Sequence, residues 1–495
     1  MNIKSILFRW YAAYKCPSIL KEHIHANEIQ NKTLIYLLRT ADRTSFGRDH
    51  QMHNIEDYED FCSYIPVRNY EDFLPYIQMM QEGEPDVLWK GKPLYYAMTS
   101  GTTAGVKYIP ISRESIKHHI ESARNVLLFY VLQNRQVDLF SGKMMFLQGS
   151  PSLNKLDDTL MGRLSGIVFH HVPAFFLKNR LPSYNVNIIE DWETKVRAIV
   201  GETVREDMTV LGGIPPWVIM YLEELSKVAN KPIGEVFPNL ALYVHGGVNF
   251  APFKSKMREL LGKEVTMLDT FPASEGFFAY QNDSTAPEML LNINAGIFYE
   301  FVELEAYMKD GALNPKRLIE VDLQVNYVLI ITTNAGLWRY AIGDTVKFVS
   351  RNPYKILVTG RIKQFVSAFG EHVIAEEVDA AMAELMAEFK VSVRDFHVYP
   401  NVENKRHEWL IEWEEPIPHN LHEISKALDL LICKKNKYYR DLIEGSIIQP
   451  LQIISLAPKS FYNYYKSMEK LGGQNKVVRL SNDRILADKL RGDFE

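Results

Sequence analysis

Apolar positions along the chain switch repeatedly between strand spacing and helix spacing. Strand-like apolar runs occur at 144–148, 208–211, 240–244 and 265–268. Between and beside them, amphipathic stretches with helical spacing occur at 188–200, 217–228 and 252–261. Strands that alternate with helices predict an α/β fold, with mainly parallel sheets flanked by helices. In such sheets ligands bind at the carboxyl ends of the strands.

The flanking regions have other patterns. Residues 1–90 are mostly helical and irregular in pattern, which indicates a supporting layer, and 150–186 has no clear period and predicts long loops over a cavity. Residues 289–359 are dominated by strand-like runs. After the polar break at 360–363, helices and strands mix in a unit large enough to fold on its own core. We therefore expect a large N-terminal domain at 1–361 and a small C-terminal α+β domain at 362–495, joined by a hinge.

The stretch from Thr99 to Lys107 interrupts two strand-like runs with four hydroxyl side chains and two glycines. Glycine lets backbone N–H groups turn toward one point, and the hydroxyls and Lys107 add donors and a positive charge. These features favour a loop that wraps a polyanion, although an ordinary turn between strands has the same composition. The order of residues excludes the phosphate loop of nucleotide triphosphatases, because Lys107 is followed by Tyr108 and by a strand.

Composition narrows the class of protein. The chain has 495 residues, of which 46% are hydrophobic and 24% charged, the range of globular proteins. A net charge of −5 without long like-charged blocks argues against a nucleic-acid partner. Cys16, Cys62 and Cys433 are far apart and form no paired motif, so we expect free thiols in a reducing, cytoplasmic setting. No apolar run has the length of a membrane span, and we expect no membrane partner.

Four motifs in fixed order carry a family resemblance. They are the loop at 99–107, Phe-Pro-Ala-Ser-Glu at 271–275, Trp-Arg-Tyr-Ala-Ile-Gly-Asp at 338–344, and Gly-Arg-Ile-Lys at 360–363 followed by Gly370-Glu371. The chain resembles the adenylate-forming superfamily of acyl-CoA synthetases, peptide-synthetase adenylation domains and luciferases. Within it, the motifs are most similar to the auxin-responsive acyl-acid–amido synthetases of plants and their bacterial relatives. The resemblance spans roughly 95–480, and the Arg-x-x-x-Gly-Asp spacing is one residue longer than in the family.

The resemblance implies an ATP- and Mg²⁺-dependent ligase. A small carboxylic acid would attack the α-phosphate of ATP to give an acyl-adenylate and pyrophosphate, and an amino acid amine would then displace AMP. Two alternatives stay open at this point. One is a ligase with the same first step and coenzyme A as acceptor, and the other is a nucleotide-binding module without turnover.

The resemblance assigns the first two motifs to the phosphates and the metal. The loop would hold the β- and γ-phosphates through Ser100, Gly101, Thr102, Thr103, Gly105 and Lys107. Glu275 would hold Mg²⁺, and Ser274 or its backbone would meet the α-phosphate. A solvated loop lysine is the alternative for Lys107, and a helix N-cap with a first-turn glutamate is the alternative for Ser274 and Glu275.

Other positions would hold the nucleoside. Asp344 would accept both ribose hydroxyls, since a carboxylate has two acceptor oxygens, but a Gly-Asp turn between strands is also common. Arg339 could meet phosphate or pair with a carboxylate. The adenine would lie along Gly246, Gly247 and Val248, for which a plain strand-to-helix turn is the alternative.

The remaining candidate residues belong to the hinge, the small domain and the acyl pocket. Arg361 and Lys363 match the hinge signature of the superfamily, in which the small domain rotates between the two half-reactions. His372 stands where the plant pattern has a phosphate-binding lysine. Lys476 ends a glycine-rich turn that resembles a loop entering the active site, with a flexible basic tail as the alternative. Candidates for the acyl pocket are Trp217, Phe271 and the aromatic residues of 169–176.

Overall fold

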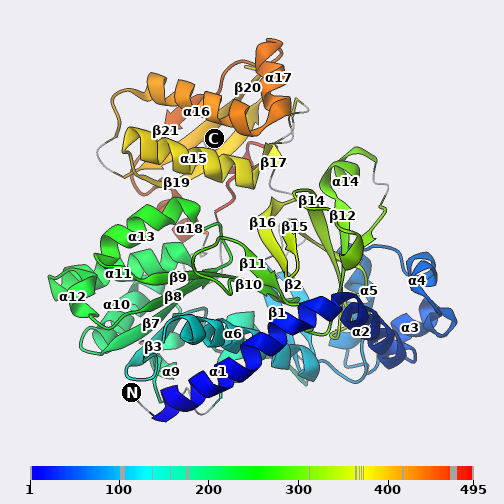
Figure 1. Ribbon diagram of the computed structural model, residues 1–495. Helices are drawn as coiled ribbons and strands as arrows, with labels where there is room; N and C mark the ends of the chain where they lie inside the picture. Colours follow the sequence, from blue (N-terminus) through cyan, green and yellow to red (C-terminus); the bar gives the residue numbers. More distant parts are fainter. Residues whose placement is uncertain are drawn as a thin grey trace. The chain divides into compact units, whose positions relative to one another are not determined.

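The largest sheet in the described part of the chain is mixed and has twelve strands, which lie between residues 143 and 361 (Figure 1). The computed structural model describes residues 3–100, 106–135, 138–156, 158–173, 178–310, 313–362, 365–366, 368–369, 371, 373–414, 417–468 and 477–492. It divides into two compact units. Unit 1 comprises 1–247, 258–342 and 346–357, and unit 2 comprises 248–257, 343–345 and 358–495. The main segment of unit 2 thus begins three residues before the boundary expected at 361.

One half of the large sheet is parallel, as the alternation of strands and helices predicts. Its strands run in the order β9-β8-β7-β3-β6, with bounds Thr266–Ala273, Leu242–Gly246, Met208–Gly213, Lys143–Leu147 and Arg180–Leu181. The crossovers carry helices α9 (Tyr184–Asn187), α10 (Trp192–Thr203), α11 (Pro215–Ala229), α12 (Ile233–Val236) and α13 (Lys254–Leu261). These strands therefore end along one edge of the sheet.

The other half corrects the expectation of a mainly parallel sheet. From β9 outward its strands are β10 (Gly276–Tyr280), β11 (Met289–Leu291), β16 (Tyr354–Arg361), β15 (Tyr340–Arg351), β14 (Asn326–Thr333), β12 (Ile297–Glu303) and β13 (Lys316–Arg317). The pairs β9–β10, β10–β11, β11–β16, β14–β12 and β12–β13 are antiparallel. The physical reason is connection length. A parallel pair needs a long crossover, usually a helix, whereas most strands of 266–361 follow one another through short turns. Helix α14 (Leu304–Asp310) follows β12 in the chain and precedes its neighbour β13.

A second, four-stranded sheet contains the two strands on either side of the Ser/Thr loop. Its order is β2-β1-β5-β4, with bounds Val106–Ile111, Tyr95–Ser100, Thr159–Gly162 and Asn154–Leu156. Region 150–186, expected to be loops, thus supplies two of these strands together with β6, α7 (Leu164–Phe169) and α9. Each is too short to show a period in the sequence. After β2, Ser112 caps α6 (Arg113–Gln133) as expected, because its hydroxyl accepts from Ser115 N.

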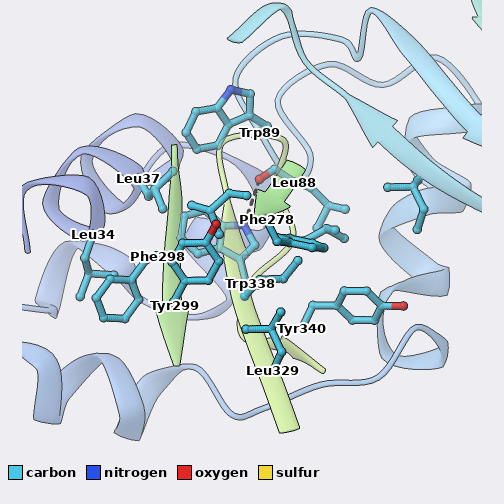
Figure 2. Packing of buried hydrophobic residues seen from close by; sticks show 14 of the residues in the cluster. Leu34, Leu37, Leu88, Trp89, Phe278, Phe298, Tyr299, Leu329, Trp338 and Tyr340 are labelled. Carbon is cyan, nitrogen blue, oxygen red and sulfur yellow. Dashed lines mark hydrogen bonds between the residues drawn. The ribbon is translucent and has the colours of Figure 1, made fainter. Parts of the chain in front are cut away.

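The N-terminal region is helical, as predicted, and packs on the sheet. Its helices are α1 (Ile3–Glu22), α2 (Ala26–Ala41), α3 (Ser45–Asp49), α4 (Tyr58–Tyr64) and α5 (Leu74–Gln81). Figure 2 shows Leu34 and Leu37 of α2 in one apolar cluster with Phe298 and Tyr299 of β12 and with Trp338. The Trp338 indole donates to Leu88 O at 3.1 Å and is fully buried. This packing fixes the supporting layer to the strands that carry the later motifs.

Unit 2 has a small core of its own. A three-stranded sheet runs in the order β19-β20-β21, with bounds Val393–Asn401, Arg406–Trp413 and Gln452–Ser455. Helices α15 (Ala375–Phe389) and α16 (Leu421–Lys435) lie against it (Figure 1). The unit also contains β17 (Phe365–Val366), β18 (Val373–Ile374), α17 (Lys437–Glu444), α18 (Ser460–Ser467) and α19 (Ile485–Arg491). Within the described ranges, no helix of either unit has the length and apolarity to cross a bilayer.

Replacing Trp338 tests whether the N-terminal layer depends on this core. Trp338→Ala removes a buried ring and a hydrogen bond, so we expect the free energy of unfolding to fall by about 3–5 kcal/mol. Urea unfolding measures the change. Trp10→Ala is the matched control, since Trp10 is 76% exposed on α1 and its loss should cost under about 0.5 kcal/mol. Equal destabilisation by the two substitutions would contradict this account of the core.

Candidate active site

The carboxyl ends of the parallel strands bring several expected residues to one edge of the large sheet. Gly246 ends β8, and a Cβ there would lie 2.3 Å from Thr270 O of β9. Gly247 follows with a φ of +83°, a conformation that favours glycine. The two glycines therefore let neighbouring backbones approach closely beside the edge where ligands of such sheets bind. Val248 is the first residue of unit 2.

Lys107 lies on β2 and is oriented by two tyrosines. Its Nζ donates to Tyr340 Oη at 3.4 Å and lies 4.9 Å from the centre of the Tyr70 ring. Tyr70 is held in turn, because its hydroxyl accepts from Tyr108 N at 2.7 Å. Lys107 is half-buried. The alternative of a solvated loop lysine is therefore wrong, since aromatic packing positions this cation.

Glu275 and Ser274 form the two-residue turn of the β9–β10 hairpin, in which Ala273 pairs with Gly276. The alternative of a helix N-cap is wrong, because strands lie on both sides of the turn. Burial raises the pKa of the Tyr70 hydroxyl, and the negative charge of Glu275 adds to that rise. Tyr70 thus lies against the Lys107 cation and within electrostatic range of the Glu275 carboxylate. One ring of unit 1 therefore senses two of the expected phosphate and metal residues.

Asp344 lies within β15, not in a turn between strands, and is 6% exposed. The preceding Gly343 has a φ of +87°, and its carbonyl accepts from Ile362 N at 2.8 Å. Arg361 holds the carboxylate through two contacts, Nε to Oδ1 at 2.7 Å and Nη2 to Oδ2 at 3.3 Å. A carboxylate has about four lone-pair positions, so roughly two stay available for further donors. Two expected nucleotide residues of unit 2 are thereby joined.

Arg339 takes the second of its two expected roles. It is 4% exposed and pairs with the fully buried Glu300, with Nη2 to Oε1 at 2.9 Å and Nε to Oε2 at 3.0 Å. Its Nη1 donates to the carbonyls of Cys62 and Ile65 at 3.2 and 2.7 Å. The guanidinium therefore joins the end of α4 to the sheet. A phosphate role would require this buried pair to break.

Seven expected residues lie outside the described part of the chain. They are Gly101, Thr102, Thr103, Gly105, Lys363, His372 and Lys476. Ser100 ends β1, and Ser274 is buried in its turn. Of the acyl-pocket candidates, Trp217 packs edge-on against Trp192 with ring centres 4.9 Å apart. Phe271 packs against Phe278 in the core.

Sequence analysis did not assign a role to a pair of polar residues at the same sheet edge. His245 and Asp269 face each other across β8 and β9, with Nδ1 3.3 Å from Oδ1, and His245 is buried. The available signal was positional, because each stands near the carboxyl end of a predicted parallel strand. Their side chains lie beside Gly246 and Thr270, the glycine and threonine that bring the two strand ends together.

The charges of the described residues suit a metal that is shared with a ligand. Among those residues, no group of three or more His, Cys, Asp and Glu side chains could enclose a metal ion. Mg²⁺ does not need such a cage, because it commonly binds one or two carboxylates together with phosphate oxygens and water. Glu275, half-buried at a turn, fits that donor set.

Sequence comparison places three domain models of one family along the chain. The GH3 family N-terminal domain matches residues 18–183, its central domain 290–361 and its C-terminal domain 376–485. Among curated proteins, the chain is similar to the jasmonoyl-L-amino acid synthetase JAR4 of Nicotiana attenuata. The two are 23% identical over 462 residues, which cover 79% of each protein. The jasmonoyl-L-amino acid synthetase GH3.5 of Oryza sativa subsp. japonica is 23% identical over 552 residues, covering 93% of this chain and 94% of that one.

Solved structures share the fold. The GH3.15 acyl acid amido synthetase has a TM-score of 0.78 at 17% identity, covering 97% of this chain and 95% of that chain. A 2-hydroxyisobutyryl-CoA ligase, in complex with 2-HIB-AMP in the postadenylation state, has a TM-score of 0.60 at 14% identity. That match covers 94% of this chain and 91% of the ligase.

The buried pair of Arg339 and Glu300 gives a test of its structural role. Glu300→Gln leaves the guanidinium buried without a counter-charge, so we expect the free energy of unfolding to fall by about 3–5 kcal/mol. Chemical denaturation measures the change, with Glu305→Gln as the control because Glu305 is exposed on α14. If Glu300→Gln proved as harmless as the control, the pair would not hold α4 to the sheet.

Proposed function

Because the chain belongs to the GH3 family, whose three domain models match it in order, we propose that it is an ATP-dependent amido synthetase. The enzyme activates a carboxylic acid as an acyl-adenylate, with release of pyrophosphate, and an amino acid amine then displaces AMP. The observation that carries the proposal is this order of family domains on an adenylate-forming fold. The shared setting of Lys107 and Glu275 around Tyr70 supports it.

The first half-reaction joins two anions, a carboxylate and the α-phosphate of ATP. The enzyme must therefore neutralise charge and hold the phosphates in line for displacement. Lys107 supplies a positive charge that Tyr70 and Tyr340 already orient, so little reorganisation accompanies the reaction. The hydroxyls and backbone N–H groups of the loop from Ser100 to Gly105 supply further donors to the β- and γ-phosphates.

Mg²⁺ is proposed as the metal of the nucleotide. When bound, it neutralises phosphate charge and orients the phosphate oxygens. Glu275 would hold it, since this carboxylate is half-buried in the hairpin turn and within electrostatic range of Tyr70, the ring that orients Lys107. Ser274, next to it in the turn, would donate to the α-phosphate.

The nucleoside is proposed to bind through the remaining motifs. Gly246, Gly247 and Val248 would lie along the adenine, because the glycines leave room for a flat ring near the strand end. Asp344 would accept the two ribose hydroxyls with the acceptor positions that Arg361 leaves available. Arg361 acts as a positioning residue in this scheme, since it fixes the carboxylate.

We propose that the small domain contributes to the two half-reactions through the hinge and through two basic positions. Lys363 would belong to the hinge with Arg361, and His372 and Lys476 would approach the phosphates in one of the two half-reactions. The acceptor is proposed to be an amino acid, as the names of the plant relatives state for those proteins. We also propose a cytoplasmic location, because the three cysteines are free thiols.

Acid-dependent exchange of pyrophosphate into ATP tests the first half-reaction. We expect exchange with at least one class in a panel of aromatic, indolic, jasmonate-like and fatty acids, and formation of an acyl hydroxamate when hydroxylamine is added. Amino acids should then yield amides. A product formed only with coenzyme A would assign the chain to the acyl-CoA ligases. Nucleotide binding without exchange on any acid would assign it to a module without turnover.

Substitution of Asp344 tests the ribose contact. Asp344→Asn keeps the shape of the side chain but removes its charge and one acceptor, so we expect the KM for ATP to rise by about tenfold. The melting temperature should change little, because Arg361 is largely solvated and tolerates the loss. Asp322→Asn is the matched control, since Asp322 also pairs with basic residues but lies on the surface. A drop in stability without a change in KM would make Asp344 structural.

A further inference from the structure

Three basic side chains converge on the segment that follows β3. Lys195 of α10 is 3% exposed, and its Nζ donates to Gln148 O at 3.3 Å and to Asn187 O at 2.6 Å. With the Gln148 amide turned so that its oxygen faces β6, that oxygen accepts from Arg180 Nη2 at 2.6 Å and its nitrogen donates to Ser165 O at 3.2 Å. Arg163 reaches the same place from the end of β5. Three separate segments of the chain thus bring positive charge to the residues that follow β3.

Contacts with Gly149 place Arg163 in this group. A Cβ at Gly149 would lie 3.0 Å from Arg163 Cδ and 3.3 Å from Ser165 Oγ, so the arginine passes directly over the glycine backbone. Arg180 is held from the other side, because its guanidinium lies 3.5 Å from the centre of the Phe169 ring and donates to Phe169 O. We call Arg163, Arg180 and Lys195 the basic cluster.

The basic cluster has no counter-charge in the described part of the chain. None of its three members forms an ion pair with a described carboxylate, and the Arg163 guanidinium has no hydrogen-bond partner there. Burial and the charge of Arg163 lower the pKa of the Lys195 ammonium to about 8. Burial also lowers the pKa values of Arg163 and Arg180. Lys195 is buried and the two arginines are half-buried. Cations withdrawn from water in this way are normally paired, so an anion would complete the arrangement.

Unpartnered polar atoms surround the same segment. Asn187 is fully buried, and neither atom of its side-chain amide has a hydrogen-bond partner among the described residues. The same holds for the buried Ser165 Oγ. Buried polar groups in folded proteins are nearly always hydrogen-bonded, so a cluster of exceptions indicates a bound group that supplies the partners. The missing hydrogen-bond partners are an observation separate from the missing counter-charge.

The position of the basic cluster in the sheet limits which anion it meets. Gln148 follows the last residue of β3, and β3 is two strands from β8 and three from β9. With strands about 4.8 Å apart, the cluster lies roughly 10–14 Å from the strand ends proposed to hold adenine and Glu275. The cluster is therefore too far from the α-phosphate to hold the carboxylate that reacts there. The α-carboxylate of an amino acid is only two bonds from its attacking amine and would stay near those strand ends.

We propose that the basic cluster binds a second carboxylate of the acyl substrate, so that the enzyme activates one end of a dicarboxylic acid. The inference rests on the proposed function and names the substrate class of its acyl site. Arg163 and Arg180 suit a carboxylate because guanidinium groups bind it through paired N–H donors. Lys195 adds a third positive charge to the cluster. β5, which precedes Arg163, pairs with β1, the strand before the Ser/Thr loop. The phosphates of ATP are therefore the competing anion for the basic cluster. For this reason the experiment measures the KM for ATP separately.

The test compares matched acids in pyrophosphate exchange by the full-length protein. The pairs are hexanoate with hexanedioate, octanoate with octanedioate, decanoate with decanedioate, and benzoate with benzene-1,4-dicarboxylate. We expect kcat/KM to favour the dicarboxylate of at least one pair by about tenfold or more. Arg163→Gln should abolish that preference while the KM for ATP and activity on the monocarboxylate are retained. Arg180→Gln is the second variant, and Arg197→Gln, on the exposed face of α10, is the control.

The outcomes separate this inference from the proposed function. Exchange that favours monocarboxylates in every pair, unchanged in both variants, would overturn the dicarboxylate assignment and leave the ligase intact. A variant that raises only the KM for the amino acid, or only that for ATP, would overturn it in favour of the acceptor or the phosphates. Absence of exchange with every acid, including the wider panel above, would remove both proposals. Melting temperatures identify any variant that fails to fold, in which case the other arginine variant decides.

Discussion

The buried ion pair between Arg339 and Glu300 is the contact on which much of unit 1 depends. Arg339 also donates to the carbonyls of Cys62 and Ile65, which end and follow α4. Arg68 then hydrogen-bonds to the start of β15, because Arg68 N donates to Arg339 O at 2.9 Å and Ala341 N donates to Arg68 O at 2.8 Å. Removing either charge would leave the other buried without a partner, which costs far more than an exposed pair is worth. The pair therefore locks an N-terminal segment to a strand more than 270 residues away.

The Arg339–Glu300 pair also positions residues that are proposed to act on the phosphates. Tyr70 ends the fixed segment and Tyr340 begins the strand, and these two rings orient Lys107. Glu275 reaches the same neighbourhood from a hairpin turn. A cation and a carboxylate proposed for the phosphates thus depend on one structural arginine that itself takes no part in the reaction. The extra residue in the Arg-x-x-x-Gly-Asp motif fits this arrangement, since Arg339 serves packing and Asp344 lies farther along the same strand.

The parallel half of the sheet imposes a second constraint. Its strands end along one edge, so groups from successive crossovers lie in the order of the strands and not in the order of the chain. Gly246 and the His245–Asp269 pair belong to β8 and β9, whereas the basic cluster meets the chain just after β3, at Gln148. The distance between them, set by strand spacing, is the reason to assign the cluster to the far end of a substrate. Two carboxylates at opposite ends of one elongated molecule would match the two ends of this edge.

The sequence by itself determined the α/β class, the helical N-terminal layer, the helix cap at Ser112 and the order of motifs that places the chain in its family. These features are local, because periodicity, capping and motif spacing are read within a few turns or strands. The antiparallel half of the sheet followed from short connections that the strand pattern did not specify. Only the tertiary structure decided that Arg339 pairs with Glu300, that Glu275 lies in a hairpin turn, and that Arg163, Arg180 and Lys195 meet at Gln148. Such contacts join residues far apart in sequence, and which partner a buried charge finds depends on how the strands are ordered in the sheet.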